Sequence, residues 1–182
     1  MSKLVKRSLI ALVVLVVVAF GVLRYMRIQT KKASPEETVT FVLDDFHIAI
    51  DYSRPSKKGR AVFGGLVPYG KVWRTGANEA TTFTVNKAIT FGGTSVAPGT
   101  YTLWTIPAPD QWTVVLNSKM YGWGIDFDGN AQRDPQADVA KANVPVIPLT
   151  EPVEQFTIEV VKDPTALVLM WDNVSVSVPL GQ

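Results

Sequence analysis

The run from Trp73 to Glu79 gathers side chains that could bind a charged or hydroxylated ligand. Arg74 carries a planar guanidinium whose hydrogen-bond donors suit a carboxylate, sulfate or phosphate group. Trp73 offers a flat ring for a sugar or a base, while Asn78 and Glu79 offer polar groups for ligand hydroxyls. The alternative is structural, because an Arg74 that pairs with Asp51 or Glu79 would brace the loop instead of binding a ligand.

A basic cluster precedes this run and extends the candidate site. Its members are Arg54, Lys57, Lys58 and Arg60. If their loop folds toward Arg74, the two groups would form a rim that attracts anions; a solvated charged loop is the competing interpretation. Tyr52 and Tyr69 lie in the same irregular segment, where an aromatic ring is free to contact a ligand. The predicted ligand-binding residues are Asp51, Tyr52, Arg54, Lys58, Arg60, Tyr69, Trp73, Arg74, Thr75, Asn78 and Glu79.

Two carboxylates in this region could also support hydrolysis. Glycosidases place two carboxyl groups about 5–10 Å apart, and Glu79 with Asp51 or Asp45 could satisfy that distance while Arg74 holds a charged substrate. His47 is the only histidine of the chain. It shares a strand face with Asp51, but about 13 Å of extended chain separates the two, which excludes a direct base–orienter hydrogen bond. A hydrolase therefore stays an alternative to a non-catalytic role.

The composition limits the chemistry that the chain can perform. There is no cysteine, so disulfides and thiolate ligands are excluded, and one histidine makes a zinc site of the usual kind unfavourable. Asp126 to Asp134 alternate oxygen ligands as a calcium loop does, but Gly129 comes at the fourth position and Ala137 replaces the bidentate Glu. No metal site and no cofactor is predicted. The net charge is +2, and most of the surplus lies in the first 32 residues, which disfavours a nucleic-acid partner.

The N-terminal segment is apolar and has basic residues on both sides. Residues 8–23 contain no charged side chain. As a helix they span about 24 Å, less than the roughly 30 Å of a bilayer core, but the flanking Lys and Arg side chains can snorkel. We therefore predict that residues 4–28 contact a membrane, with a cleaved signal peptide as the alternative. Either form predicts that the following domain lies on the periplasmic or extracellular side.

Beyond this segment the apolar residues alternate with polar ones, as in half-buried strands, from Thr38 onward. Short links such as Gly92-Gly93, Pro98-Gly99 and Asp172-Asn173 suit antiparallel neighbours. About nine strands without helical periodicity predict an all-β antiparallel sandwich after one N-terminal transmembrane helix. The predicted parts are a membrane anchor or uncleaved signal segment at 1–28, a tether at 29–37 and a β-sandwich domain at 38–182.

Several long runs give the domain a family resemblance. They are Asp51–Arg60, Val62–Gly70, Lys71–Thr81, Pro98–Pro107 and Trp112–Asn117. With these runs the chain resembles the bacterial domain-of-unknown-function 2911 family from about residue 38 to residue 179. The resemblance implies an exported, β-rich single domain and carries no activity that could be transferred. Residues 122–138 depart from the family's pattern.

Three functions follow from these observations. The favoured one is a non-catalytic, membrane-anchored envelope module that binds a glycan, a small anion or a partner protein through residues 52–79. The second is a hydrolase that uses Glu79 or Asp51, with Arg74 holding a charged substrate. The third is a structural or assembly subunit with its interface on an open strand edge.

Overall fold

The computed structural model describes residues 2–181 and divides the chain into two compact units, residues 1–33 and residues 34–182. The first unit is α1 (Lys3–Ala33), none of whose residues is buried. Among the described residues it is the one helix long and apolar enough to cross a membrane, a property that signal sequences share. The N-terminal apolar helix predicted from the sequence is therefore present.

The segment expected to be a tether has regular structure instead. Helix α1 continues through residues 29–33, and β1 (Glu36–Leu43) begins three residues after it ends. Thr30 donates from its hydroxyl to the Arg27 carbonyl within the helix, at 2.9 Å. Pro35 explains the stop, because a proline pushes the residue before it out of the helical region.

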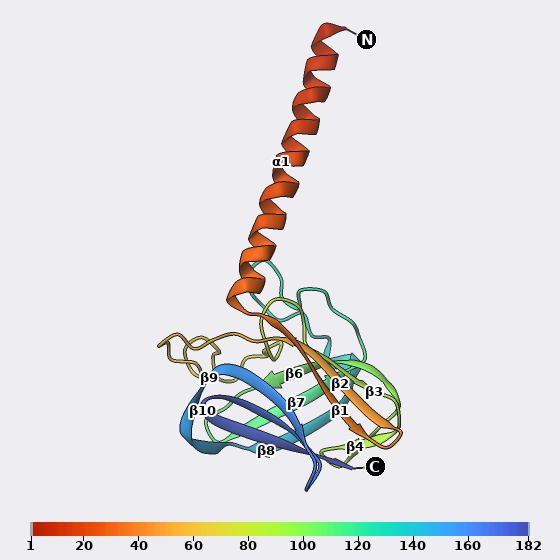
Figure 1. Ribbon diagram of the computed structural model, residues 1–182, viewed down its shortest axis with the longest axis vertical. Helices are drawn as coiled ribbons and strands as arrows, with labels where there is room; N and C mark the ends of the chain where they lie inside the picture. The colour runs from red at the N-terminus through yellow and green to blue at the C-terminus, as the bar shows by residue number, and fades with distance from the viewer. Residues whose placement is uncertain (1, 182) are drawn as a thin grey trace. The chain divides into compact units, whose positions relative to one another are not determined.

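The second unit consists of two antiparallel sheets (Figure 1). The six-stranded sheet has the order β1, β2 (Phe46–Ser53), β3 (Thr82–Val85), β6 (Gly99–Ile106), β7 (Gln111–Asn117) and β8 (Asp138–Pro145). The four-stranded sheet has the order β5 (Thr94–Val96), β4 (Ile89–Phe91), β10 (Ala166–Gly181) and β9 (Ile147–Val161). A single turn of 3₁₀ helix, η1 (Pro135–Ala137), precedes β8. The predicted β-sandwich is confirmed.

One predicted link differs from the structure. Asp172-Asn173 does not form a hairpin, because β10 runs through it without a break. The register of β10 against β9 shifts on both sides of Asp172, whose φ is +54°. A β-bulge of this kind accommodates an extra residue within a paired strand, so turn-forming residues do not require a chain reversal here.

Alternating side chains of both sheets fill one core between them. Phe83 and Leu103 from the six-stranded sheet, and Phe156 and Trp171 from the four-stranded sheet, are at most 1% exposed. Burying one large apolar side chain stabilises folding by about 1.5–3 kcal/mol. The six-stranded sheet is thereby a rigid layer, and its other face is available to carry polar groups.

The outer face of the six-stranded sheet carries a polar row that crosses all six strands. The strand registers pair these residues in succession, from β1 to β8: Thr38, Asp51, Thr82, Thr102, Asn117 and Asp138. Two long loops connect these strands, residues 54–81 between β2 and β3 and residues 118–134 between β7 and η1. Beside the row, Trp104 and Val115 form a small second core that is covered by Val72 from the first loop and Tyr121 from the second. The loops therefore cover part of this face and leave a pocket next to β1 and β2.

Candidate functional site

A pocket of about 400 Å³ lies where β1, β2 and the loop before β3 meet. Its lining residues are Glu36, Glu37, Thr38, Asp51, Tyr52, Ser53, Glu79, Ala80 and Thr82. Three of the residues predicted from the sequence, Asp51, Tyr52 and Glu79, are among them. The pocket thus brings together three segments of the chain, residues 36–38, 51–53 and 79–82.

Asp51 is held at the pocket wall by hydroxyl groups from both neighbouring strands. Its Oδ1 accepts a hydrogen bond from Thr38 Oγ1 at 2.6 Å, and its Oδ2 accepts one from Thr82 Oγ1 at 3.4 Å. All three residues belong to the polar row of the outer face. A carboxylate has about four lone-pair sites, so these two bonds orient Asp51 and leave it further acceptor capacity.

Ser53 lies two residues after Asp51 on β2 and faces the same side of the sheet. It is only 2% exposed, although it lines the pocket. The loop before β3 packs on its backbone: Ala77 N donates to Ser53 O at 3.2 Å, and Gly76 approaches so closely that a Cβ would lie 3.0 Å from that oxygen.

Tyr52 borders the pocket, but its ring and hydroxyl belong to the hydrophobic core. The ring packs edge-on against Phe156 in the core, and its hydroxyl accepts a hydrogen bond from Ile158 N at 3.0 Å. Burial raises the pKa of this phenol above its ordinary value. A tyrosine that is 4% exposed and bonded to a buried amide is part of the core.

The run from Trp73 to Glu79 is divided between the core and the loops. Trp73 stacks on Trp171 at 5.8 Å between ring centroids and donates from Nε1 to Gly76 O at 3.0 Å. Thr75 is fully buried, with its Oγ1 3.3 Å from Thr105 Oγ1. Asn78 donates from Nδ2 to the Ser34 carbonyl at 3.1 Å. These three side chains shape the loop that carries Glu79 and Ala80 to the pocket.

Arg74 connects the two long loops. Its Nη1 donates to the Trp123 carbonyl at 2.9 Å, and the guanidinium lies 5.8 Å from the centroid of the Trp123 ring. Burial lowers the pKa of Arg74, and the negative charge of Glu79 acts in the opposite direction. Arg74 influences the pocket through Glu79 but does not line it.

The basic cluster faces β9 and β10 instead of the pocket. Arg54 donates from Nε to Phe156 O at 3.0 Å and from Nη2 to Thr157 Oγ1 at 2.7 Å, and it forms an ion pair with Glu37. Lys57 forms an ion pair with Asp172. The backbone amide of Lys58 donates to Glu154 Oε1 at 2.8 Å.

The last two predicted residues also lie outside the pocket lining. Arg60 bonds the carbonyls of Lys57 and Ser56, and Tyr69 is 43% exposed. The predicted cationic rim with Arg74 is therefore not part of the pocket wall.

Sequence reasoning missed six residues of the lining, which are Glu36, Glu37, Thr38, Ser53, Ala80 and Thr82. Ser53 could have been found, because its two-residue spacing from Asp51 puts both side chains on one strand face. Glu36 and Glu37 could not have been found, because both belong to the predicted tether and β1 is expected to begin after them. Thr38 and Thr82 are recognisable only once the strand register is known.

A family model for a protein of unknown function (DUF2911) matches residues 34–180. The chain belongs to this family. The matched range begins one residue after α1 ends and covers both sheets of the DUF2911 domain. Comparisons with curated proteins and with solved structures gave no match.

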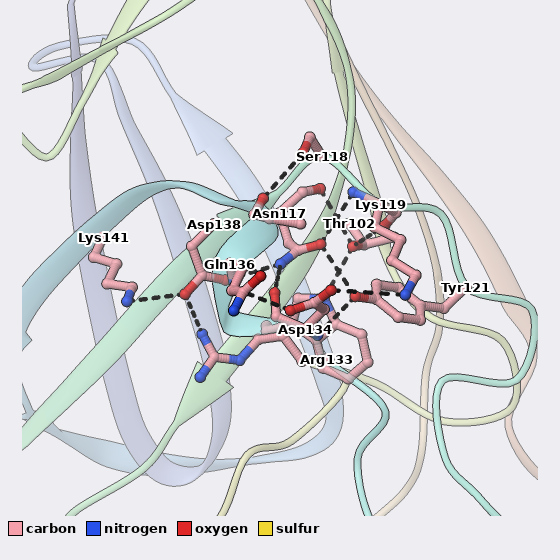
Figure 2. A network of polar contacts seen from close by, with 12 residues as sticks. Thr102, Asn117, Ser118, Lys119, Tyr121, Arg133, Asp134, Gln136, Asp138 and Lys141 are labelled. Atoms are coloured by element: carbon pink, nitrogen blue, oxygen red, sulfur yellow. Dashed lines mark hydrogen bonds and ion pairs between the residues drawn. The ribbon is translucent and has the colours of Figure 1, made fainter.

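In this DUF2911 domain the second long loop is tied to the sheet by a polar network (Figure 2). Asn117 donates from Nδ2 to Asp134 O at 2.8 Å and to Asp138 Oδ1 at 2.9 Å. Tyr121 accepts from Asp134 N through its hydroxyl at 2.8 Å, and Arg133 Nη1 lies 2.6 Å from Asp138 Oδ2. The network lies at the end of the polar row on β7 and β8. This is the other edge of the six-stranded sheet from β1 and β2, where the pocket lies.

The calcium-like run of this loop forms an ordinary turn. Asp126 Oδ1 accepts from the backbone amides of Asp128 and Asn130 at 3.0 and 2.8 Å. These backbone hydrogen bonds, that from Asn130 foremost, hold the pKa of Asp126 below its ordinary value. Within residues 2–181, no group of three or more His, Asp or Glu side chains is arranged to hold a metal ion.

Proposed function

We propose that this protein is a non-catalytic binding module, held at a membrane by α1, whose β-sandwich domain binds a small polar ligand in the pocket beside Asp51. The observation that carries the proposal is the pocket of about 400 Å³ lined by polar side chains of two paired strands. Small-molecule sites commonly enclose about 300–1,000 Å³ on a preformed scaffold. Strands buried against a core supply such a scaffold.

The lining favours one of the ligand classes considered from the sequence over the others. Four carboxylate residues and three hydroxyl residues with outward side chains face or border the space, and the lining includes no Lys, Arg or His. Glu37 is paired with Arg54, while the Asp51 carboxylate, oriented by Thr38 and Thr82, repels a small anion and accepts hydrogen bonds from ligand hydroxyl groups. A ligand rich in donors, such as a glycan, therefore fits the pocket better than a phosphate or a sulfate.

We place the domain on the outer side of the membrane in this proposal. Support comes from the position of α1 near the N-terminus, ahead of the folded domain. Basic residues lie on both sides of the apolar stretch, so the proposal rests on export being the usual outcome for an N-terminal segment of this type. The domain that follows would then face the periplasm or the exterior.

The test is a thermal-shift screen of the full chain in detergent against glycans, amino compounds, nucleotides and inorganic anions. Thr38→Arg puts a long side chain beside Asp51 and should abolish the shift given by a true pocket ligand. Thr40→Arg is the matched control, because Thr40 is exposed on the same strand face and outside the pocket lining. A shift that survives Thr38→Arg, or a screen without any shift, would contradict the proposal.

One observation supports a hydrolase as a second candidate: Asp51 and Glu79 line the same pocket. A pair of carboxylates on opposite sides of a substrate is the arrangement that glycosidases use. Hydrolysis of a glycan by the full chain, reduced about 10²–10⁴-fold by Asp51→Asn and by Glu79→Gln, would establish this activity. Binding of a glycan without its hydrolysis would support the non-catalytic binding module instead of the hydrolase.

A further inference from the structure

The second long loop, residues 118–134, exposes three large apolar side chains within eight positions. Met120 is 50% exposed, Trp123 is 39% exposed and Phe127 is fully exposed. A single exposed apolar residue is ordinary on a soluble domain, but several large ones on one loop are typical of a surface that contacts a partner or a membrane. The pocket beside Asp51 does not use these side chains.

Phe127 lies at the tip of a short hairpin within this loop. Ile125 pairs with Ala131 in an antiparallel bridge, and Gln132 N donates to Gly124 O at 2.9 Å. The turn between them is held by the backbone hydrogen bonds to Asp126 described above. Three residues of extended chain separate Gly124 from Phe127, which is about 10 Å. A formed turn, and not a loose segment, therefore presents the exposed ring.

A series of hydrogen bonds connects this loop to the residue at which the domain begins. The Ser34 carbonyl accepts from Asn78 Nδ2 at 3.1 Å. Two residues further along the same loop, Ala80 N donates to Gly122 O at 3.1 Å, and Gly122 directly precedes Trp123. The base of the hairpin thus lies near the point where the chain enters the domain.

Helix α1 leaves no spacer before that point, because it ends at Ala33 and the domain begins at Ser34. With residues 4–28 in a membrane, the five helical residues that follow extend about 8 Å beyond it. The headgroup layer on each side of a bilayer is about 5–8 Å thick. Ser34 would then lie at the outer boundary of the headgroups, within reach of a hairpin about 10 Å long.

We infer that the second long loop docks on the surface of the membrane that holds α1, with Phe127 and Trp123 inserted among the lipid headgroups. The inference rests on the membrane anchor proposed above and adds a second contact with the same bilayer. Aromatic side chains favour the interface between water and hydrocarbon. A lipid surface is the occupant that we choose, because the covalent connection to α1 keeps a bilayer near this loop at all times.

The charge of the loop determines which lipids suit it. Asp126, Asp128 and Asp134 outnumber Lys119 and Arg133, so residues 118–134 carry one net negative charge. Anionic lipids attract basic segments and repel acidic ones. The contact is therefore apolar, and it should be stronger on zwitterionic phosphatidylcholine than on membranes that contain phosphatidylglycerol.

The experiment measures tryptophan fluorescence of the full chain in phosphatidylcholine vesicles with and without bromine on the acyl chains, since bromine quenches an indole only at close range. Helix α1 contains no tryptophan. Trp104, Trp112 and Trp171 are at most 2% exposed, and Trp73 packs against the core. Trp123 is one of five tryptophans, so brominated lipid should remove up to about a fifth of the emission. Trp123→Phe should abolish this quenching.

A second variant tests the hairpin tip. Phe127→Asp should reduce the quenching of Trp123 at least about twofold, because the inserted apolar surface is replaced by a charge. Val42→Asp is the matched control and should change nothing. Val42 is also exposed and apolar, but it lies near the end of β1, about 20 Å of extended strand from Glu36. Both side chains are on the surface, so neither variant should impair folding.

The outcomes separate docking of the loop from anchoring by α1. Flotation of the full chain with the vesicles on a density gradient reports the anchor alone. If the chain floats but brominated lipid does not quench it, or quenching persists in Trp123→Phe, the docking inference is wrong and the anchor remains. Protection of Trp123 from acrylamide without quenching by lipid would show that a second copy or another protein covers the loop instead. If the chain does not float, both the anchor and the docking fail.

Discussion

The guanidinium of Arg74 uses its hydrogen-bonding capacity inside the protein. It donates to the Trp123 carbonyl and lies over the Trp123 ring. The same donor fork that suits an anionic ligand also suits a backbone carbonyl, so the residue type alone does not distinguish the two roles. At this position a loop-to-loop contact is the observed one.

We expect Arg74→Ala to lower the free energy of unfolding by about 1–3 kcal/mol, because it removes a charge-assisted hydrogen bond and a cation–π contact. Chemical denaturation measures this change. Lys71→Ala is the control, since Lys71 is exposed in the same loop and should shift stability by less than about 0.5 kcal/mol. Full stability of Arg74→Ala combined with lost ligand binding would instead make Arg74 a ligand residue.

Asp138 gives the domain a pH dependence. Burial acts to raise the pKa of Asp138, but hydrogen bonds from Lys141 and Asn117 and the charge of Arg133 outweigh it and hold the pKa below its ordinary value of 3.8. The folded state thus favours the ionised form more than the unfolded chain does. The stabilisation is complete above the unfolded pKa and is lost as the pH falls through the folded pKa.

The corresponding experiment is urea denaturation over a series of pH values. Asp138→Asn should lower stability at neutral pH by about 1–3 kcal/mol and make the decline below about pH 4 shallower than in the wild type. Asp110→Asn, at an exposed aspartate beside β7, is the control and should change stability at neutral pH by less than about 0.5 kcal/mol. Parallel profiles for Asp138→Asn and the wild type would show that another group sets the acid limit.

At the level of single elements, the β4–β5 hairpin depends on a glycine pair whose members have different tasks. Gly92 has a φ of +56°, and a Cβ there would lie 2.3 Å from the Cβ of Ala142 on β8. Gly93 has a φ of +89°, and a Cβ at this position would have no other atom within 4 Å. Gly92 therefore serves both the turn and the close approach of this hairpin to β8, whereas Gly93 serves the turn alone.

Gly92→Ala should cost about 2–4 kcal/mol, because backbone strain and overpacking add. Gly93→Ala should cost about 1–2 kcal/mol from backbone strain alone. The two denaturation midpoints in guanidinium chloride provide the comparison. Equal losses for both variants would mean that β8 moves to accept the methyl group.

The strand β10 shows how an element can differ from its local sequence signals. Asp172-Asn173 has turn-forming residues, yet pairing with β9 on both sides keeps the chain extended through a bulge. Trp171 and Val176 on either side of the bulge are at most 1% exposed, and a hairpin there would remove one of them from the core. Core packing outweighs the local preference for a turn.

For the whole molecule, the two units predict that the domain folds without α1. The domain's contacts begin at residue 34: the Ser34 carbonyl accepts from Asn78 Nδ2, and the Pro35 carbonyl accepts from Arg54 N at 2.8 Å. We expect residues 34–182 to be soluble and cooperatively folded without detergent, as measured by circular dichroism and thermal melting. A start at residue 37 should lower the melting temperature, because both bonds are lost.

Aggregation of residues 34–182 would contradict this division of the chain. So would equal melting temperatures for the two truncated forms, because that result would give residues 34–36 no part in stability. The full chain in detergent is the reference for both, since it contains every described contact.

The amino-acid sequence by itself determined the apolar N-terminal helix, the alternating strands of the sandwich and the face on which each strand residue lies. These properties depend on short-range periodicity, which the covalent geometry of the chain imposes. The same periodicity places Asp51 and Ser53 on one face and Tyr52 on the other. Trp73, expected at a ligand, lies in the core because the four-stranded sheet supplies its ring partners.

Only the tertiary structure decided which polar groups meet. Thr38, Asp51 and Thr82 come from three strands, and their contact depends on the register of two antiparallel pairings. A register shift of one residue would turn each side chain to the other face, and nothing in a single strand fixes its partner. The pocket arises from that pairing and from the loop that carries Glu79, because long-range packing selects one register among those that local sequence allows.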